Sequence, residues 1–416
     1  MKVLVLRIAG VFFFFALSLF LTNFFDPEIV GKYDFARASL LVLGGICMLG
    51  TNQAIIYYSG EFTALENMSR LKSVYFKMIL IILSIALLFV LVGILVPEQF
   101  FNAFFAKADA GELIFKILLA LSAFAISLLN IDTLRALKYP LFSELYRNIF
   151  RYTPFFLGAV LLYFTGHADW LVEVYLLGFV VLAVFSSLHV YLVFREQRDV
   201  PVTEPAISYK NILKRSYPMA LSAVTYFLMQ STDIVLLGKF SDFESVAFYA
   251  VAVKLAMVTS LALQSVNVII APKIAEEFNR DDKLALNQVV RQSTRLIFFL
   301  SLPALAILAA LTSFFLGFFG QEYIVAKSAL LILLLGQLIN TLCGPVGVYM
   351  NMTGKQNKLQ QILFLGFLVN LILNWYLIPE YGMEGAALAT AISMALWNAL
   401  AVIYTYRKDR IKLFIS

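Results

Sequence analysis

Apolar segments of about twenty residues recur along the whole chain, and each is long enough to cross the hydrocarbon layer of a membrane as a helix. None shows the strict alternation of a β-barrel strand, and a helix satisfies its own backbone hydrogen bonds within lipid. The pattern predicts an all-α polytopic membrane protein with about twelve transmembrane helices. The predicted spans are 5–24, 37–58, 75–96, 113–134, 142–165, 170–193, 213–237, 245–270, 292–317, 326–350, 359–379 and 384–406.

Composition supports this class. Of the 416 residues, 61% are hydrophobic and only 14% are charged, against roughly 25% charged residues in soluble domains. The net charge of +6 does not indicate a nucleic-acid partner, because the basic residues lie in short loops between apolar segments. The two cysteines lie inside apolar segments and the two histidines are isolated, so we expect no disulfide, no metal and no cofactor.

The distribution of basic residues predicts the orientation. With the N-terminus placed in the cytoplasm, 25 of the 32 lysines and arginines fall on the cytoplasmic side of the twelve spans, as the positive-inside rule requires. No small-residue cleavage site follows the first apolar segment, so we expect it to be a retained helix. Both termini are predicted to be cytoplasmic, in a multi-pass protein.

The two halves of the chain resemble each other. A polar linker, 195–211, separates residues 1–200 from residues 201–416, and each half carries six predicted spans. At an offset of 216 residues, Glu28, Val30 and Tyr33 match Glu244, Val246 and Tyr249. The matches favour a duplication into two six-helix lobes. Parallel repeats of this kind are a transporter architecture with a substrate site between the halves.

Charged residues inside predicted spans are costly in lipid and usually face a cavity. Arg147 and Arg151 are spaced i, i+4, and Lys254 lies about ten residues into its span, or roughly 15 Å deep. Arg37 is the nearest counterpart of Lys254 in the first half. We predict that these four residues line a cationic cavity between the halves.

Acidic residues offer partners for these cations. Asp233 is the nearest acidic candidate for Lys254, as a structural ion pair or as a coupling residue. Asp132, near the end of the fourth span, is expected to pair with Arg135 at i, i+3.

Two short motifs bear on mechanism. Gly344, Pro345 and Gly347 interrupt the tenth span and predict a kink or hinge, because proline and paired glycines weaken a helix. Gly354-Lys355 is followed by Gln356 rather than Ser or Thr, so it does not form a phosphate-binding loop for ATP.

One weak enzymatic signal is the acidic pair Asp26 and Glu28 in the first external loop, where membrane glycosyltransferases often place such residues. Glu28 has a repeat partner in Glu244, which favours a role in starting a helix. We expect no catalytic residues and no enzymatic activity.

The chain resembles the polysaccharide-exporting branch of the multidrug/oligosaccharidyl-lipid/polysaccharide (MOP) superfamily, and in particular the O-antigen flippases of the Wzx type. The most specific segment runs from Gly344-Pro345-Val346-Gly347 into Asn351-Met352-Thr353-Gly354. Other segments that carry the resemblance are Pro27–Tyr33, Asp233 with Leu236-Leu237-Gly238, Ala271-Pro272-Lys273 and 381–387.

The resemblance implies a MATE-like fold with alternating access, a bacterial inner-membrane location and an undecaprenyl-pyrophosphate-linked oligosaccharide as substrate. Arg37, Arg147, Arg151 and Lys254 would then hold the pyrophosphate. The partners that the resemblance implies for this chain are the lipid-linked oligosaccharide, membrane lipid, a polysaccharide polymerase and a chain-length regulator. A cation-coupled multidrug antiporter of the same fold and an integral-membrane glycosyltransferase are the alternatives.

Overall fold

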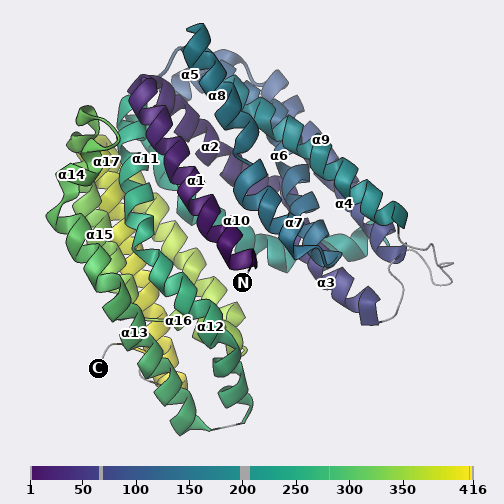
Figure 1. Ribbon diagram of the computed structural model, residues 1–416, viewed down its shortest axis with the longest axis vertical. Helices are drawn as coiled ribbons and strands as arrows, with labels where there is room; N and C mark the ends of the chain where they lie inside the picture. The colour runs from purple at the N-terminus through teal and green to yellow at the C-terminus, as the bar shows by residue number, and fades with distance from the viewer. Residues whose placement is uncertain (1, 65–68, 197–206, 281, 412, 415–416) are drawn as a thin grey trace. The chain divides into compact units, whose positions relative to one another are not determined.

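A computed structural model describes residues 2–64, 69–196, 207–280, 282–411 and 413–414. All secondary structure among these residues is helical (Figure 1). The chain divides into two compact units, Met1–Ser231 and Thr232–Ser416. The predicted lobe boundary at 200/201 lies outside the described residues and stays a prediction.

The first unit is built around one central helix. Helix α6 packs against α2, α3, α4 and α9. Its buried face carries Phe124, whose ring centre lies 5.0 Å from that of Phe179 in α9. The elements of this unit are α1 (Lys2–Phe24), α2 (Pro27–Met48), α3 (Thr51–Ala64), α4 (Ser69–Leu95), α5 (Glu98–Phe105), α6 (Ala110–Ala136), α7 (Pro140–Leu145), η1 (Tyr146–Phe150), α8 (Thr153–Thr165), η2 (Ala168–Trp170), α9 (Leu171–Glu196) and most of α10 (Tyr209–Phe240).

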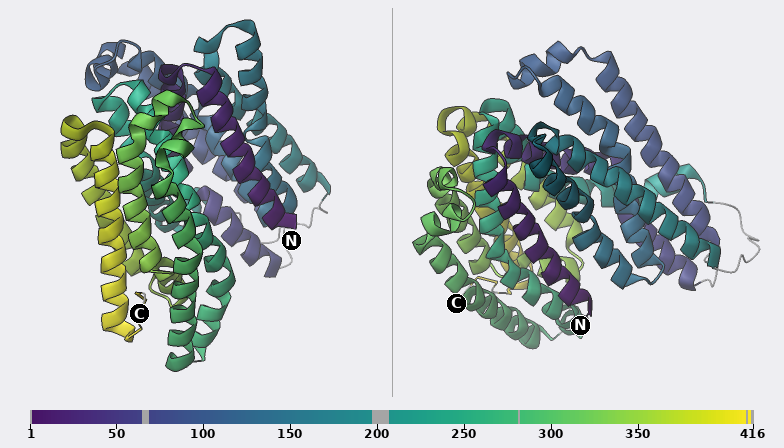
Figure 2. Two further views of the ribbon diagram at one scale, coloured as in Figure 1. Left: turned by 60° about the vertical axis from the view of Figure 1, so that its left-hand side comes forward. Right: turned by 45° about the horizontal axis from the view of Figure 1, so that its top comes forward.

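The second unit is also built around one central helix. Helix α15 packs against α11, α13 and α17, and α12 and α13 lie side by side in all three views (Figures 1 and 2). Its elements are α11 (Phe243–Val258), α12 (Ser260–Asn279), α13 (Lys283–Ala310), α14 (Thr312–Gly317), η3 (Gln321–Ala326), α15 (Lys327–Leu342), α16 (Val346–Met352) and α17 (Gln356–Asp409).

Matching signals start a helix in each unit at the predicted offset. The side chain of Asp26 caps α2 by accepting a hydrogen bond from the Glu28 amide at 2.9 Å, and Asp242, 216 residues later, caps α11 through the Ser245 amide at 2.7 Å. Each cap satisfies an otherwise unpaired amide of the first turn. Both helices then bend into a second helix, by 45° for α2–α3 and 42° for α11–α12. The local structure thus supports the duplication.

Helix α17 is a hairpin of two helices. Gly382 has φ +55° and ψ −129°, a conformation that residues with a side chain rarely adopt. Asn370 donates to Ser393 at 3.2 Å across the turn, and Gly366 packs against Trp397. Both pairs are centred near residue 382. The turn therefore separates the predicted spans 359–379 and 384–406.

Seven helices among the described residues are long and apolar enough to cross a membrane, and counting each bent pair as one span gives up to nine. One of the seven is α17, which covers two predicted spans. The predicted spans 142–165 and 213–237 lie on the α7–η1–α8 segment and on α10. The membrane class and the helical fold are confirmed, and the count of twelve stays a prediction.

Candidate functional site

The segment that carries two of the predicted arginines is a turn of π-helix. Helix η1 spans Tyr146–Phe150, and the Arg151 amide donates to the Tyr146 carbonyl at 3.0 Å, one residue further back than in an α-helix. The Ser143 hydroxyl ties the start of this segment to α6 by donating to the Ile131 carbonyl at 2.8 Å. Single π-turns inside helices occur frequently at functional sites.

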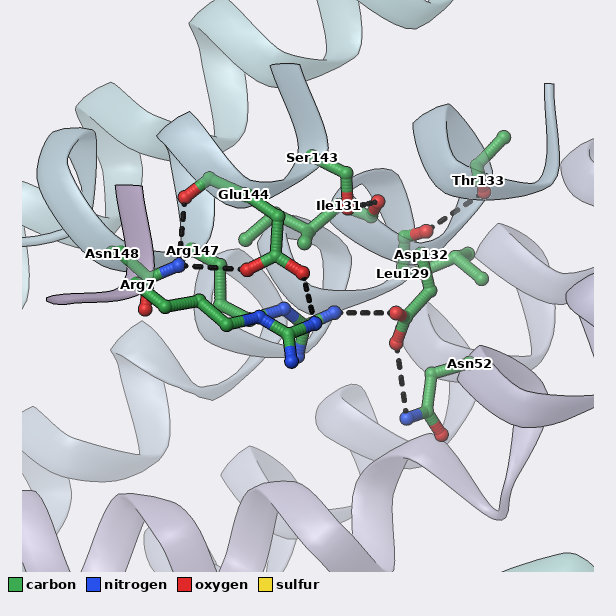
Figure 3. Close-up of polar contacts among 10 residues, drawn as sticks. All are labelled: Arg7, Asn52, Leu129, Ile131, Asp132, Thr133, Ser143, Glu144, Arg147 and Asn148. Carbon is green, nitrogen blue, oxygen red and sulfur yellow. Dashed lines mark hydrogen bonds and ion pairs between the residues drawn. The ribbon is translucent and has the colours of Figure 1, made fainter. Parts of the chain in front are cut away.

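Arg147 is paired with a carboxylate of α6 (Figure 3). Its guanidinium lies 2.5 Å from Asp132, whose second oxygen accepts a hydrogen bond from Asn52 of α3 at 3.3 Å. The expectation that Asp132 pairs with Arg135 is therefore wrong. Arg135 shares the helix of Asp132, whereas tertiary packing brings Arg147 of η1 against it.

A second pair of the same kind lies beside the first (Figure 3). Arg7 of α1 contacts Glu144 of α7 at 2.5 Å, and Asn148 donates to the same carboxylate at 2.9 Å. Two arginines thus meet two carboxylates, and the four charges cancel. This arrangement joins α1, α3, α6 and the α7–η1 segment, and Arg147 has less free charge to offer an anion than the sequence suggested.

Arg151 has different surroundings although it also faces α6. Its guanidinium carbon lies 5.7 Å from the ring centres of Phe124 and Tyr152 and 5.6 Å from that of Phe179. Its Nε is buried without a hydrogen-bond partner among the described residues. Ring faces attract a cation but do not satisfy its N–H groups, so the Nε–H of this arginine is left without an acceptor among the described residues.

Arg37 lies near Arg151. Arg37 pairs with the fully buried Asp34 at 3.1 Å, and both guanidinium groups lie within electrostatic reach of the Tyr175 hydroxyl. The ring centre of Tyr175 lies 4.9 Å from that of Tyr33 and 5.3 Å from that of Phe179. We call Arg37, Arg151, Asp34 and Tyr175 the arginine–aromatic cluster. Its formal charge is +1, and aromatic rings surround it.

The fourth predicted cation lies in the other unit. Lys254 is on α11 and only 4% exposed, whereas the three arginines belong to Met1–Ser231. The structure describes each unit by itself, so a common cavity that includes all four cations stays a prediction.

Asp233 is the centre of a buried polar network in the second unit. Its carboxylate accepts hydrogen bonds from the hydroxyls of Tyr249 at 2.7 Å and Thr390 at 3.3 Å. Asn370 donates to Thr390 at 3.4 Å, and Asn374 donates to Asn370 at 3.0 Å. The Oδ1 atom of Asn374 is buried without a partner among the described residues. This network places several oxygen atoms around one buried carboxylate, and the predicted pairing of Asp233 with Lys254 stays a prediction.

The interruption of the tenth predicted span is present. Helix α15 ends at Leu342 and α16 begins at Val346, with Gly344 at φ +62° between them. Pro345 precedes α16, and Gly347 lies in its first turn with open space where a side chain would point. The break is a feature of the fold, and its use as a hinge stays a prediction.

The structure also shows where the acidic pair of the first external loop lies. Glu28 forms an exposed ion pair with Lys32 at 3.1 Å, four residues along α2, and Lys32 also contacts Asp109 at 2.7 Å. Asp26 is the helix cap. These contacts explain both residues through helix formation.

Several residues of these networks were not predicted from the sequence. The pairing of Asp34 with Arg37 had a signal, because a carboxylate and a guanidinium at i, i+3 share a helix face. Asn370 and Asn374, at i, i+4 in an apolar span, had a similar signal. The Arg147–Asp132 pair had none, because the two residues are brought together only by packing.

The chain is similar in sequence and in fold to known membrane proteins. Residues 218–376 match the MatE family model. The chain is 25% identical over 333 residues to a probable low-salt glycan biosynthesis flippase of Haloferax volcanii, covering 79% of this chain and 68% of that protein. It is 23% identical over 206 residues to the capsular polysaccharide biosynthesis protein CapF of Staphylococcus aureus, covering 48% and 50%.

Two solved structures share its fold. A multidrug resistance MATE transporter of the MOP superfamily in an inward-facing conformation has a TM-score of 0.76 at 14% identity, over 98% of both chains. The lipid II flippase MurJ in an inward closed conformation has a TM-score of 0.75 at 16% identity, over 98% of this chain and 88% of that one. At these identities the likeness concerns the fold.

Proposed function

We propose that this chain, which has the fold of the MOP-superfamily transporters, is a flippase that moves a pyrophosphate-linked oligosaccharide on an undecaprenyl carrier from the cytoplasmic to the outer leaflet. The observation that carries the proposal is Arg151, a cation among three rings whose buried Nε lacks a hydrogen-bond partner among the described residues. A pyrophosphate supplies the anionic acceptor oxygens that such a guanidinium binds best. The glycan-pathway names of two relatives support the choice of substrate.

In this proposal the arginine–aromatic cluster holds the head group. Arg151 binds a phosphate oxygen, and Arg37, oriented by Asp34, supplies a second positive charge. Arg147 serves mainly to join η1 to α6 through Asp132, and Lys254 supplies charge from the second unit. The polyprenyl chain stays in lipid while the glycan follows an aqueous path through the protein.

Asp233 is the candidate for coupling transport to an ion gradient. A buried carboxylate with hydroxyl and amide oxygens close by can bind a small monovalent cation at lower cost than a bare carboxylate would, because these oxygens can serve as further ligands to the cation. The network of Tyr249, Thr390, Asn370 and Asn374 supplies these groups. We propose a bacterial inner-membrane location with both termini cytoplasmic, and a polysaccharide polymerase and a chain-length regulator as the proteins that act on the flipped unit.

The second candidate function is a cation-coupled multidrug antiporter. It is favoured by the fold of the multidrug MATE transporter and by the same buried Asp233. The two functions differ in what the first unit binds, since an anion site is of no use for cationic drugs. A glycosyltransferase activity has less support, because Glu28 is engaged with Lys32 in the first turn of α2.

Deletion of the gene in its host tests the proposal. We expect loss of the surface glycan together with accumulation of lipid-linked oligosaccharide on the cytoplasmic side, both restored by the wild-type chain. Normal surface glycan with increased drug sensitivity would instead support the antiporter. Loss of glycan without accumulation of the lipid-linked unit would support the glycosyltransferase.

A further inference from the structure

The chain that follows α17 turns back into the second unit. Arg410 adopts a left-handed conformation with φ +62°, and its amide closes α17 by donating to the Tyr406 carbonyl at 3.0 Å. Ile411 and Leu413 are then 3% and 0% exposed, within a core that includes Tyr349 of α16 and Val290 of α13. Phe414, next to Leu413, is 49% exposed. We call Arg410, Ile411, Leu413 and Phe414 the strap.

One residue connects the strap to the break between α15 and α16. The Thr294 hydroxyl shares its one proton between the Leu413 carbonyl at 3.1 Å and the Val290 carbonyl of its own helix at 3.0 Å. The same side chain fills the space beside Gly344, where an added Cβ would lie 2.3 Å from the Thr294 Oγ1. Thr294 thus contacts both the break at Gly344 and the strap.

Asp409, the last residue of α17, contacts α16 and the residue that precedes α17. Asp409 accepts a hydrogen bond from the Tyr349 hydroxyl at 2.8 Å and forms an ion pair with Lys355 at 2.9 Å. Lys355 also lies 4.9 Å from the ring centre of Phe278 in α12. These contacts are mostly shielded, since the side chains of Lys355 and Asp409 are 11% and 19% exposed. Ion pairs in such surroundings are screened less by salt than surface pairs are.

Helix α16 depends on these contacts for its position. It has seven residues and is bounded by Gly344 at φ +62° and Gly354 at φ +73°. Continuous helix hydrogen bonding stops at both glycines, and a helix of two turns is not stable by itself. The strap and the Asp409 contacts thus hold a short, mechanically separate helix from its two ends.

We propose that the strap is a conformational latch: it holds α16 against the break at Gly344, and it leaves its site during the transport cycle so that α16 can reorient relative to α15. The holding role concerns the fold alone, and the release rests on the proposed transport function. Because Leu413 is either inserted or exposed to water, the latch has two distinct states.

A native thiol reports on the latch. Cys343 is 4% exposed and immediately precedes Gly344, and Cys47 is fully buried elsewhere. In full-length Cys47→Ala protein, we expect Leu413→Asp to increase the rate of maleimide labelling of Cys343 at least about tenfold, the effect of ~1.4 kcal/mol on an opening equilibrium. Phe414→Asp introduces the same charge one residue away on an exposed side chain and should leave the rate unchanged. Equal labelling of the Leu413→Asp and Phe414→Asp proteins would overturn the holding role.

A reversible crosslink tests the release. Thr294→Cys with Leu413→Cys, in protein without the two native cysteines, places one thiol on α13 and one on the strap, and export by the double variant before crosslinking is the reference. A bifunctional thiol crosslinker with a disulfide in its spacer should stop glycan export, and reductant should restore it. Export at the normal rate while the crosslink is intact would overturn the release. Lack of export by the uncrosslinked wild-type chain would instead count against the proposed function, which separates the two failures.

Discussion

The Tyr249 hydroxyl donates a 2.7 Å hydrogen bond to Asp233, joining α11 to α10 through two fully buried side chains. The predicted repeat partner of Tyr249 is Tyr33, which is equally buried but packs against aromatic rings. Its ring centre lies 4.9 Å from that of Phe155 and 4.9 Å from that of Tyr175. The same tyrosine thus supports a carboxylate in one unit and an aromatic cluster in the other. Under the predicted duplication, the two halves would share one framework and differ in their interiors.

Tyr249→Phe should lower stability and impair export. The change leaves the buried Asp233 with one hydroxyl donor fewer, and a lost hydrogen bond to a charged group costs about 1.5–3 kcal/mol. Thermal unfolding in detergent and export of the glycan are the measurements. Tyr376→Phe removes a hydroxyl from a 72% exposed side chain and serves as the matched control. Equal behaviour of both variants would remove Asp233 and Tyr249 from the mechanism.

Arg151→Lys should impair export less than Arg151→Ala. Lysine keeps the positive charge for the head group but cannot bind phosphate oxygens bidentately. Arg280→Ala is the control, because this arginine is 63% exposed and contacts Glu276 on the same helix. The readout is export normalised to protein in the membrane. Full export by Arg151→Ala would contradict the anion-binding role.

Exchange of charges between Arg147 and Asp132 should separate structure from binding. Each single reversal, Arg147→Asp or Asp132→Arg, places like charges together near α6 and should cost about 3–5 kcal/mol of stability. The double exchange should recover a large part of it in thermal unfolding. If Arg147 acts only by joining η1 to α6, export recovers together with stability. Recovered stability without export would instead assign Arg147 a part in binding the substrate.

The double change Asp233→Asn with Lys254→Met tests whether these residues form a structural ion pair. Removing both charges should then restore the export that either single change damages. We expect the double variant to stay defective, because Asp233 is held by Tyr249 and Thr390 and Lys254 is proposed to contribute charge to the substrate path. Full rescue would exclude Lys254 from substrate binding.

The predicted orientation can be checked with reporter fusions. A fusion after Ala168 should report the outside of the membrane and one after Asp281 the cytoplasm, since 25 of 32 basic residues lie on the side assigned to the cytoplasm. The signals of the two sites should be opposite. A shared signal would mean that a span is missing or added between them.

Features set by local sequence were predictable. Apolar segments of membrane-spanning length indicated most helices, and Gly382 lies between two predicted spans because a positive φ is easiest for glycine. Gly344 and Pro345 marked the break between α15 and α16 for a similar reason. The π-turn at Tyr146–Phe150 was not predicted, since its extra residue is stabilised by contacts with α1 and α6.

The candidate site was less predictable. Depth in a span identified Arg151 and Lys254, because charge in lipid is costly whatever surrounds it. The surroundings decide what each charge does, and they depend on packing. Arg147 meets Asp132 from fifteen residues away, while Arg151, four residues later, lies among the rings of Phe124, Tyr152 and Phe179. Sequence spacing alone treats these two arginines alike.

The turn at Gly382 has a consequence for how the protein is made. As a straight rod, the 54 residues of α17 would extend about 80 Å, more than twice the thickness of the hydrocarbon layer. Folded at one glycine, the same residues form two passes with almost no polar loop between them. The insertion machinery therefore has nothing bulky to translocate at this point, and the two passes can enter the bilayer together as a preformed pair. A substitution at Gly382 would then first affect biogenesis, because both passes would fail to insert. This defect would precede any measurable effect on transport.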